Sequence, residues 1–132
     1  MRVLIVDDNR DAADTLAMVL RMWGHEVRAV YDGPSAFLAA NDFKPHAILL
    51  DVQMPKVNGG DVALYLRHYN GCDGTLIVAT SASARDDPRL ARYEGAFDAF
   101  LSKPCDLRRL AELLGYGHTR ATKRGELMAT SC

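Results

Sequence analysis

The sequence predicts an α/β domain with a five-stranded parallel sheet and helices on both faces. Two observations support this fold class: five apolar runs of strand length bounded by turn residues, and amphipathic segments of helical period between them. The runs are RVLIV (2–6), EVRAV (26–30), HAILL (46–50), TLIVAT (75–80) and AFDAFL (96–101). Parallel neighbours need long crossover connections, which the intervening helices would supply on both faces of the sheet.

Two of the connecting segments place apolar residues at i, i+3, i+4 and i+7, the spacing of one helix face. The first such face consists of Leu16, Val19, Leu20 and Trp23, and the second of Val62, Tyr65, Leu66 and Tyr69. Gly24 and Gly71 follow these segments and should end the helices.

Three further helices are expected. The segment 34–41 begins with a proline at a favourable first position, and the segment 106–114 places Leu107, Leu110 and Leu114 on one side. The segment 88–94 is the weakest of the five, because few apolar residues anchor it.

Length and composition indicate one ordinary domain. The chain has 132 residues, 48% of them hydrophobic and 25% charged, and a net charge of -1 that favours neither nucleic acid nor a membrane surface. We expect a domain over residues 1–114 and a polar, solvated tail over 115–132. No apolar run could span a bilayer and no signal peptide is evident, so a cytoplasmic protein is expected. Cys72, Cys105 and Cys132 have no metal-binding spacing and are interpreted as free thiols.

Polar residues stand where the predicted strands end. Asp7 and Asp8 follow the first strand, Asp51 the third, Ser81 the fourth and Lys103 the fifth. Ligands of open parallel sheets bind outside the carboxyl ends of the strands. If the first and third strands are neighbours, three carboxylates converge there.

Such a cluster requires a positive partner. Two like charges about 4 Å apart repel by roughly 4 kcal/mol at an effective dielectric constant near 20. A hard divalent cation with oxygen ligands suits the carboxylates, and Mg²⁺ suits them better than Ca²⁺ or Zn²⁺. Lys103 adds a second positive charge, of a kind that binds phosphate oxygens.

Four motifs carry a family resemblance. They are VDD at 6–8, LLDVQMP at 49–55 followed by Gly59, TSA at 80–82 and SKP at 102–104. Together, over about residues 1–114, they resemble the receiver domain of bacterial response regulators in two-component signalling. The resemblance implies a flavodoxin-like sheet with strand order 2-1-3-4-5.

The resemblance also implies a phosphoacceptor site. Asp51 would take a phosphoryl group from a phosphohistidine of a partner kinase or from a small donor such as acetyl phosphate. Asp8, Asp51 and the backbone carbonyl of Gln53 would bind Mg²⁺ directly, and Asp7 through water. Lys103 would bind a phosphoryl oxygen, and the bond from it to the following proline is expected to be cis.

The family spacing selects Ser81 over Thr80 as the hydroxyl that moves toward the phosphoryl group. Phe100, three residues before Lys103, would turn inward behind it and couple the site to the face of the fourth helix, fifth strand and fifth helix. Cys105 departs from the family, in which an aromatic or aliphatic residue is expected, and is interpreted as buried filler.

The implied partners are a histidine kinase or histidine phosphotransfer protein and a downstream protein target, with the chain a monomer or weak dimer. The segment 115–132 is too short for a helix-turn-helix domain, so no direct contact with nucleic acid is expected. The chain would catalyse its own phosphorylation and dephosphorylation while acting mainly as a switch. It could be a stand-alone receiver or part of a longer protein.

Three alternative functions are less consistent with these residues. A haloacid-dehalogenase-like phosphotransferase requires a second acid, as general acid and base, at position 53, where this chain has Gln53. A flavin- or dinucleotide-binding module requires a glycine-rich phosphate loop after the first strand. The sequence after residue 6 has no such loop. A pseudo-receiver that only binds partners would not need the full set of acids and the lysine.

Overall fold

The computed structural model describes residues 1–54, 57–69, 71, 74–81 and 95–115. All five predicted strands are present and form one parallel sheet in the order β2-β1-β3-β4-β5, which confirms the predicted class and strand order. Their bounds are β1 Arg2–Val6, β2 Glu26–Val30, β3 Ala47–Asp51, β4 Leu76–Ser81 and β5 Ala99–Ser102.

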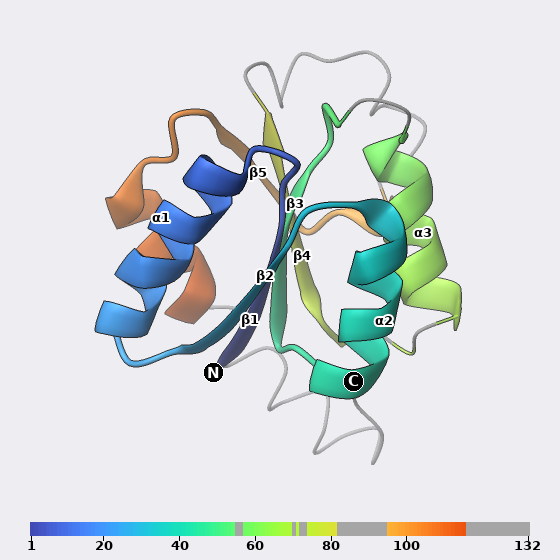
Figure 1. Ribbon diagram of the computed structural model, residues 1–132, viewed down its shortest axis with the longest axis horizontal. Helices are drawn as coiled ribbons and strands as arrows, with labels where there is room; N and C mark the ends of the chain where they lie inside the picture. Colours follow the sequence, from blue (N-terminus) through green and yellow to red (C-terminus); the bar gives the residue numbers. More distant parts are fainter. Residues whose placement is uncertain (55–56, 70, 72–73, 82–94, 116–132) are drawn as a thin grey trace.

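Helices cover both faces of the sheet. They are α1 (Arg10–Met22), α2 (Gly33–Phe43), α3 (Gly59–Tyr69) and a last helix over residues 107–115. Figure 1 shows α1, in blue, and the 107–115 helix, in orange, on one face of the sheet. The helices α2 and α3 cover the other face. The predicted helix at 88–94 and the tail from residue 116 lie outside the described residues. Within the described part of the chain, no helix has the length and apolar character needed to cross a membrane.

Local sequence signals set the helix ends. The side chain of Asn9 accepts a hydrogen bond from the amide of Ala12 at the start of α1, and Asp32 accepts one from Ser35 at the start of α2. The hydrogen bonds from Ser35 hold the pKa of Asp32 below its ordinary value. Gly24 follows α1 with φ of +95°, a backbone region that glycine tolerates best, so this predicted helix end is confirmed.

Alternating residues of the strands face two separate apolar clusters. Leu4, Leu50 and Ile77 point to the α2 and α3 side, whereas Ile5 and Leu49 point to the side of α1 and the last helix. β3 and β4 are buried along their whole length, as expected for central strands covered on both faces. Because β1, β3 and β4 are parallel neighbours, their carboxyl ends lie at one rim of the sheet.

The predicted helix faces were partly wrong. Trp23, Tyr65 and Leu107 were expected to face the sheet but are 39%, 44% and 44% exposed. In α1 the small residues Ala13 and Ala17 lie against the sheet, because small side chains let the helix approach closely. The prediction considered only large apolar residues, so it placed the buried face of α1 too close to Trp23.

The bounds of three strands also differ from the prediction. β3 and β4 each extend one residue further than expected, so Asp51 and Ser81 are the last residues of their strands and not the first residues after them. β5 begins at Ala99, three residues later than predicted, because residues 95 and 96 form a short helical turn.

Gly59, at the start of α3, packs directly on the loop after Asp51. A Cβ atom at this position would lie 2.5 Å from the Cα and 2.8 Å from the Cγ1 of Val52. The Gly59→Ala substitution should therefore lower the free energy of unfolding by about 1–3 kcal/mol through overpacking, measured by urea denaturation. Gly95→Ala is the control, since a Cβ at Gly95 meets nothing within 4 Å; equal losses in the two variants would contradict the steric explanation.

Candidate functional site

Strand pairing brings two buried carboxylates together at the rim of the sheet. β1 and β3 are neighbours, with Val6 opposite Leu50 in the register, so Asp7 and Asp51 stand side by side one position later. Both residues are buried, 7% and 4% exposed. The alternation of β1 and β3 directs both toward the side of α1 and the last helix.

Lys103 bridges these two carboxylates. Its Nζ lies 2.9 Å from Oδ2 of Asp7 and 3.1 Å from Oδ2 of Asp51. Lys103 follows β5, and its backbone amide donates to the carbonyl of Ser81 at the end of β4 (2.9 Å). The peptide bond from Lys103 to Pro104 is cis, as the resemblance implied.

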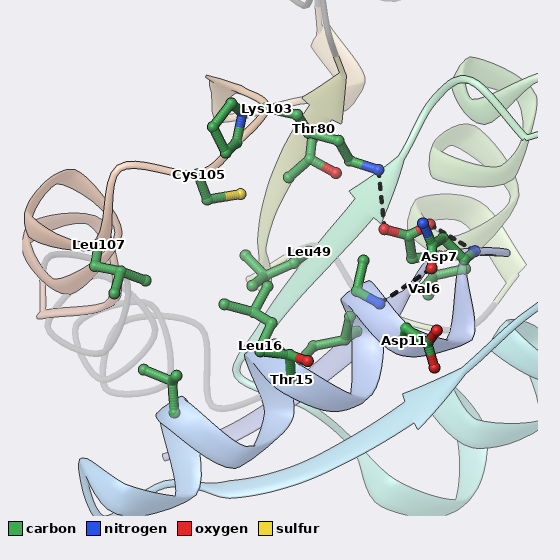
Figure 2. Close-up of a pocket in the computed structure, with 15 residues that line it drawn as sticks. Val6, Asp7, Asp11, Thr15, Leu16, Leu49, Thr80, Lys103, Cys105 and Leu107 are labelled. Carbon is green, nitrogen blue, oxygen red and sulfur yellow. Dashed lines mark hydrogen bonds and ion pairs between the residues drawn. The ribbon is translucent and has the colours of Figure 1, made fainter.

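Backbone amides hold the second oxygen of each carboxylate. The amide of Asn9 donates to Oδ1 of Asp7 (3.0 Å), and the amide of Gln53 donates to Oδ1 of Asp51 (2.9 Å). Figure 2 shows the ion pair between Lys103 and Asp7. Each carboxylate is thus held on one side by the turn that follows its strand and on the other by the ammonium group.

Asp8 completes an acidic cluster. One carboxylate oxygen from each of Asp7, Asp8 and Asp51 lies within 4.8 Å of the others, and Asp8 is the exposed member. Three hard oxygen donors with one open side fit a small divalent cation such as Mg²⁺, which keeps part of its water shell; they do not fit a metal that prefers nitrogen and sulfur ligands.

The charges in this cluster oppose one another. Burial raises the pKa of Asp51 above its ordinary value, and the charge of Asp7 adds to the increase, although the Gln53 amide and Lys103 act in the opposite direction. For Lys103, burial lowers the pKa, but the bonds to Asp7 and Asp51 outweigh it and leave the pKa raised. Lys103 therefore keeps its positive charge.

The raised pKa of Asp51 predicts a pH dependence of stability in metal-free buffer. A raised carboxyl pKa means that the folded state binds more protons than the unfolded state, so stability falls as the pH rises above the ordinary value of 3.8. The Asp51→Asn variant lacks this titration. In EDTA, the urea concentration at the unfolding midpoint should fall for the wild type relative to Asp51→Asn as the pH rises above 3.8. If the two midpoints change with pH in parallel, the raised pKa is contradicted.

The remaining predicted site residues are Ser81, Gln53 and Phe100. Ser81 is fully buried at the end of β4, and Gln53 is exposed, with its backbone amide on Asp51. Phe100 packs against Phe97, with ring centroids 5.7 Å apart, on the α2 and α3 side of the sheet. The structure therefore gathers Asp7, Asp8, Asp51 and Lys103 and places Phe100 on the opposite face.

One residue near the site was missed in the sequence, and Thr80 was considered only as an alternative to Ser81. Asn9 both orients Asp7 through its amide and caps α1 through its side chain, and its position just before a helical period was a usable capping signal. Thr80 is the register partner of Asp51 in β4. Its placement depends on strand register, which no local pattern reveals.

Comparisons with known proteins agree with this geometry. The family model described as "Response regulator receiver domain" matches residues 3–115. The transcriptional regulatory protein PrrA of Mycobacterium tuberculosis is 36% identical over 130 residues, which cover 98% of this chain and 54% of that protein. The DNA-binding response regulator MtrA of Mycolicibacterium paratuberculosis is 34% identical over 103 residues, 78% of this chain and 44% of that protein. The chain spans about half the length of these relatives.

Solved structures give the same result. A CheY-like response regulator receiver domain from Methylobacillus flagellatus has a TM-score of 0.79 and 27% identity, covering 89% of this chain and 98% of its own. The chemotaxis protein CheY4 of Vibrio cholerae has a TM-score of 0.78 and 25% identity, covering 87% and 96%. With the acidic cluster and the bridging lysine in place, the chain belongs to the response regulator receiver domain family of two-component systems.

Proposed function

We propose that this receiver domain accepts a phosphoryl group on Asp51 from a phosphohistidine of a partner protein. One oxygen of Asp51 would attack the phosphorus while the P–N bond breaks and the imidazole leaves. The observation that carries the proposal is the arrangement of Asp51, which is buried at a strand end and held in place by the Gln53 amide and Lys103. Such positioning and charge neutralisation are most of what phosphoryl transfer requires.

The acidic cluster suits the metal that this reaction uses. Asp8, Asp51 and the carbonyl of Gln53 would hold Mg²⁺, with Asp7 acting through water. When bound, the ion neutralises the charge on the phosphoryl oxygens. The chain's own residues supply the rest: the Gln53 amide keeps the Asp51 carboxylate oriented, and the turn at Asn9 keeps Asp7 oriented.

Lys103 would exchange partners during the reaction. It now bridges Asp7 and Asp51. After phosphorylation, its ammonium group would bind a phosphoryl oxygen on Asp51 while keeping Asp7. A single point charge on a flexible stem suits this change, because it needs only a short movement of one nitrogen.

Ser81 and Phe100 would carry the signal away from the site. The Ser81 carbonyl already accepts the Lys103 amide, and Phe100 lies beside Ala79 in the β4–β5 register. The Ser81 hydroxyl would bind the phosphoryl group, and Phe100 would turn inward behind it. The change would alter the surface around β5 that a downstream protein recognises.

The partners follow from this role. We propose a histidine kinase or histidine phosphotransfer protein as the donor and a protein target as the receiver of the signal, in the cytoplasm. The relatives are named as transcriptional or DNA-binding regulators, but any contact with DNA is proposed to lie outside this domain. The family match sets aside the dehalogenase-like alternative, and the pseudo-receiver is the remaining competitor.

Labelling in the presence and absence of metal tests the proposal. Incubation with acetyl phosphate and Mg²⁺ should add the mass of one phosphoryl group to the intact protein, and an excess of EDTA should remove most of this labelling, because the acidic cluster would then repel the anionic donor. Intact mass spectrometry measures both. No labelling under either condition, and none from a phosphorylated kinase, would favour the pseudo-receiver.

A further inference from the structure

A cavity of about 560 Å³ adjoins the proposed phosphorylation site, between α1 and the loop that precedes the 107–115 helix (Figure 2). Most of its lining is apolar. We call it the Thr80 pocket; its main lining residues are Leu16, Leu49, Thr80, Lys103, Cys105 and Leu107. Its volume lies within the range of roughly 300–1,000 Å³ that is typical of small-molecule sites.

The Thr80 hydroxyl is an unusual feature of this pocket. Thr80 is 5% exposed and lines the cavity from β4. Its side chain makes no hydrogen bond to any residue in the part of the chain that the structure describes. A buried hydroxyl without a partner lowers stability, so a valine of the same shape would suit the fold better. The hydroxyl is therefore available to a ligand.

Asn9, Asp11 and Thr15 also line the pocket but are exposed to solvent, and the more deeply placed polar groups favour an uncharged ligand. Lys103 is paired with Asp7 at 2.9 Å and with Asp51 at 3.1 Å, so its positive charge is already bound by carboxylates. Cys105 is half-buried, and Figure 2 shows its sulfur directed into the space beside Leu49. Burial raises the pKa of the Cys105 thiol, which is then neutral at neutral pH. The thiol is also a small group where an aromatic or larger aliphatic side chain would fill the space.

We propose that the Thr80 pocket binds a small, uncharged, mostly apolar molecule that carries one hydrogen-bonding group for the Thr80 hydroxyl. The apolar walls of Leu16, Leu49 and Leu107 would hold the body of the molecule. A flat protein surface would not reach the buried hydroxyl, which favours a small ligand over a docked protein. This inference goes beyond phosphoryl transfer, since it concerns the binding of a second small molecule beside the phosphorylation site.

An NMR titration with indole tests the proposal, because indole is neutral, mostly apolar and has one N–H donor. Indole should shift the amide signals of Leu16, Thr80 and Cys105 in a saturable way. The isosteric Thr80→Val variant should bind about five- to tenfold more weakly, the effect of losing one hydrogen bond. Thr15→Val, at the exposed rim of the pocket, should bind like the wild type, and Cys105→Phe should block binding by filling the cavity.

Urea unfolding of the Thr80→Val variant is a second test, which does not depend on measuring ligand binding. Thr80→Val should unfold at a higher urea concentration than the wild type, because it removes a buried hydroxyl without a partner. No saturable shift with the wild type, or equal affinity of the wild type and Thr80→Val, would overturn the proposal. Shifts caused by a kinase domain but not by indole would assign the pocket to protein contact and would also overturn it.

Discussion

The Asp51→Asn variant should show no phosphoryl labelling by acetyl phosphate and Mg²⁺, whereas the wild type is labelled. Asparagine keeps the size of the side chain and an oxygen that can accept the Gln53 amide, which now lies 2.9 Å from Oδ1 of Asp51. It lacks the anionic oxygen that would attack phosphorus. Intact mass spectrometry of both proteins under the same conditions measures the difference.

The matched control is Asp42→Asn. Asp42 is an exposed residue of α2 that pairs with Arg28 on the surface, so its replacement should leave labelling unchanged. Lys103 retains Asp7 as a partner in the Asp51→Asn variant, and the variant should therefore fold. Equal labelling of Asp51→Asn and the wild type would rule out Asp51 as the acceptor and direct attention to Asp7 or Asp8.

The Arg67→Met variant should lose about 3–5 kcal/mol of unfolding free energy, because it removes the buried guanidinium that pairs with the Asp98 carboxylate. Arg67, in α3, donates to Asp98 (2.8 Å) and to the carbonyls of Thr75 and Ala96. Asp98 also accepts the amide of Ile77 (2.9 Å). The network joins α3 to the beginnings of β4 and β5, at the end opposite to the carboxylates. Urea denaturation measures the loss.

The Arg28→Met variant is a close control for this prediction. Arg28 and Asp42 form an ion pair with the same nitrogen–oxygen distance of 2.8 Å, but their side chains are 47% and 75% exposed, against 11% and 9% for Arg67 and Asp98. Exposed pairs contribute about 0–1 kcal/mol. Replacing Asp98 with asparagine in the Arg67→Met background should recover part of the loss. Similar losses in the two single variants would show that burial is not the cause.

Much of the fold was readable from the sequence because its signals are local. Apolar runs such as 46–50 and 75–80 report burial directly, and Gly24 reports a helix end through its backbone preference. The helix faces were less predictable. Periodicity marks which residues could be buried, but the rotation of α1 also depends on the small Ala13 and Ala17 that let it approach the sheet.

Part of the candidate site could likewise be predicted from the sequence, and part could not. The positions of Asp7, Asp8, Asp51 and Lys103 at strand ends were visible, since an acid or a lysine after an apolar run is a local signal. The bridge from Lys103 to two carboxylates was not visible. It depends on a lysine after β5 reaching past β4 to β3 and β1, which follows from the order and twist of the sheet.

By itself the sequence determined the α/β class, the number of strands, and which acids and lysine stand at the strand ends, because each depends on residues close together in the chain. Only the tertiary structure decided that Asp51 is buried, that Thr80 lines a pocket and that Arg67 pairs with Asp98. Those features depend on register and helix rotation, which are set by packing between distant segments.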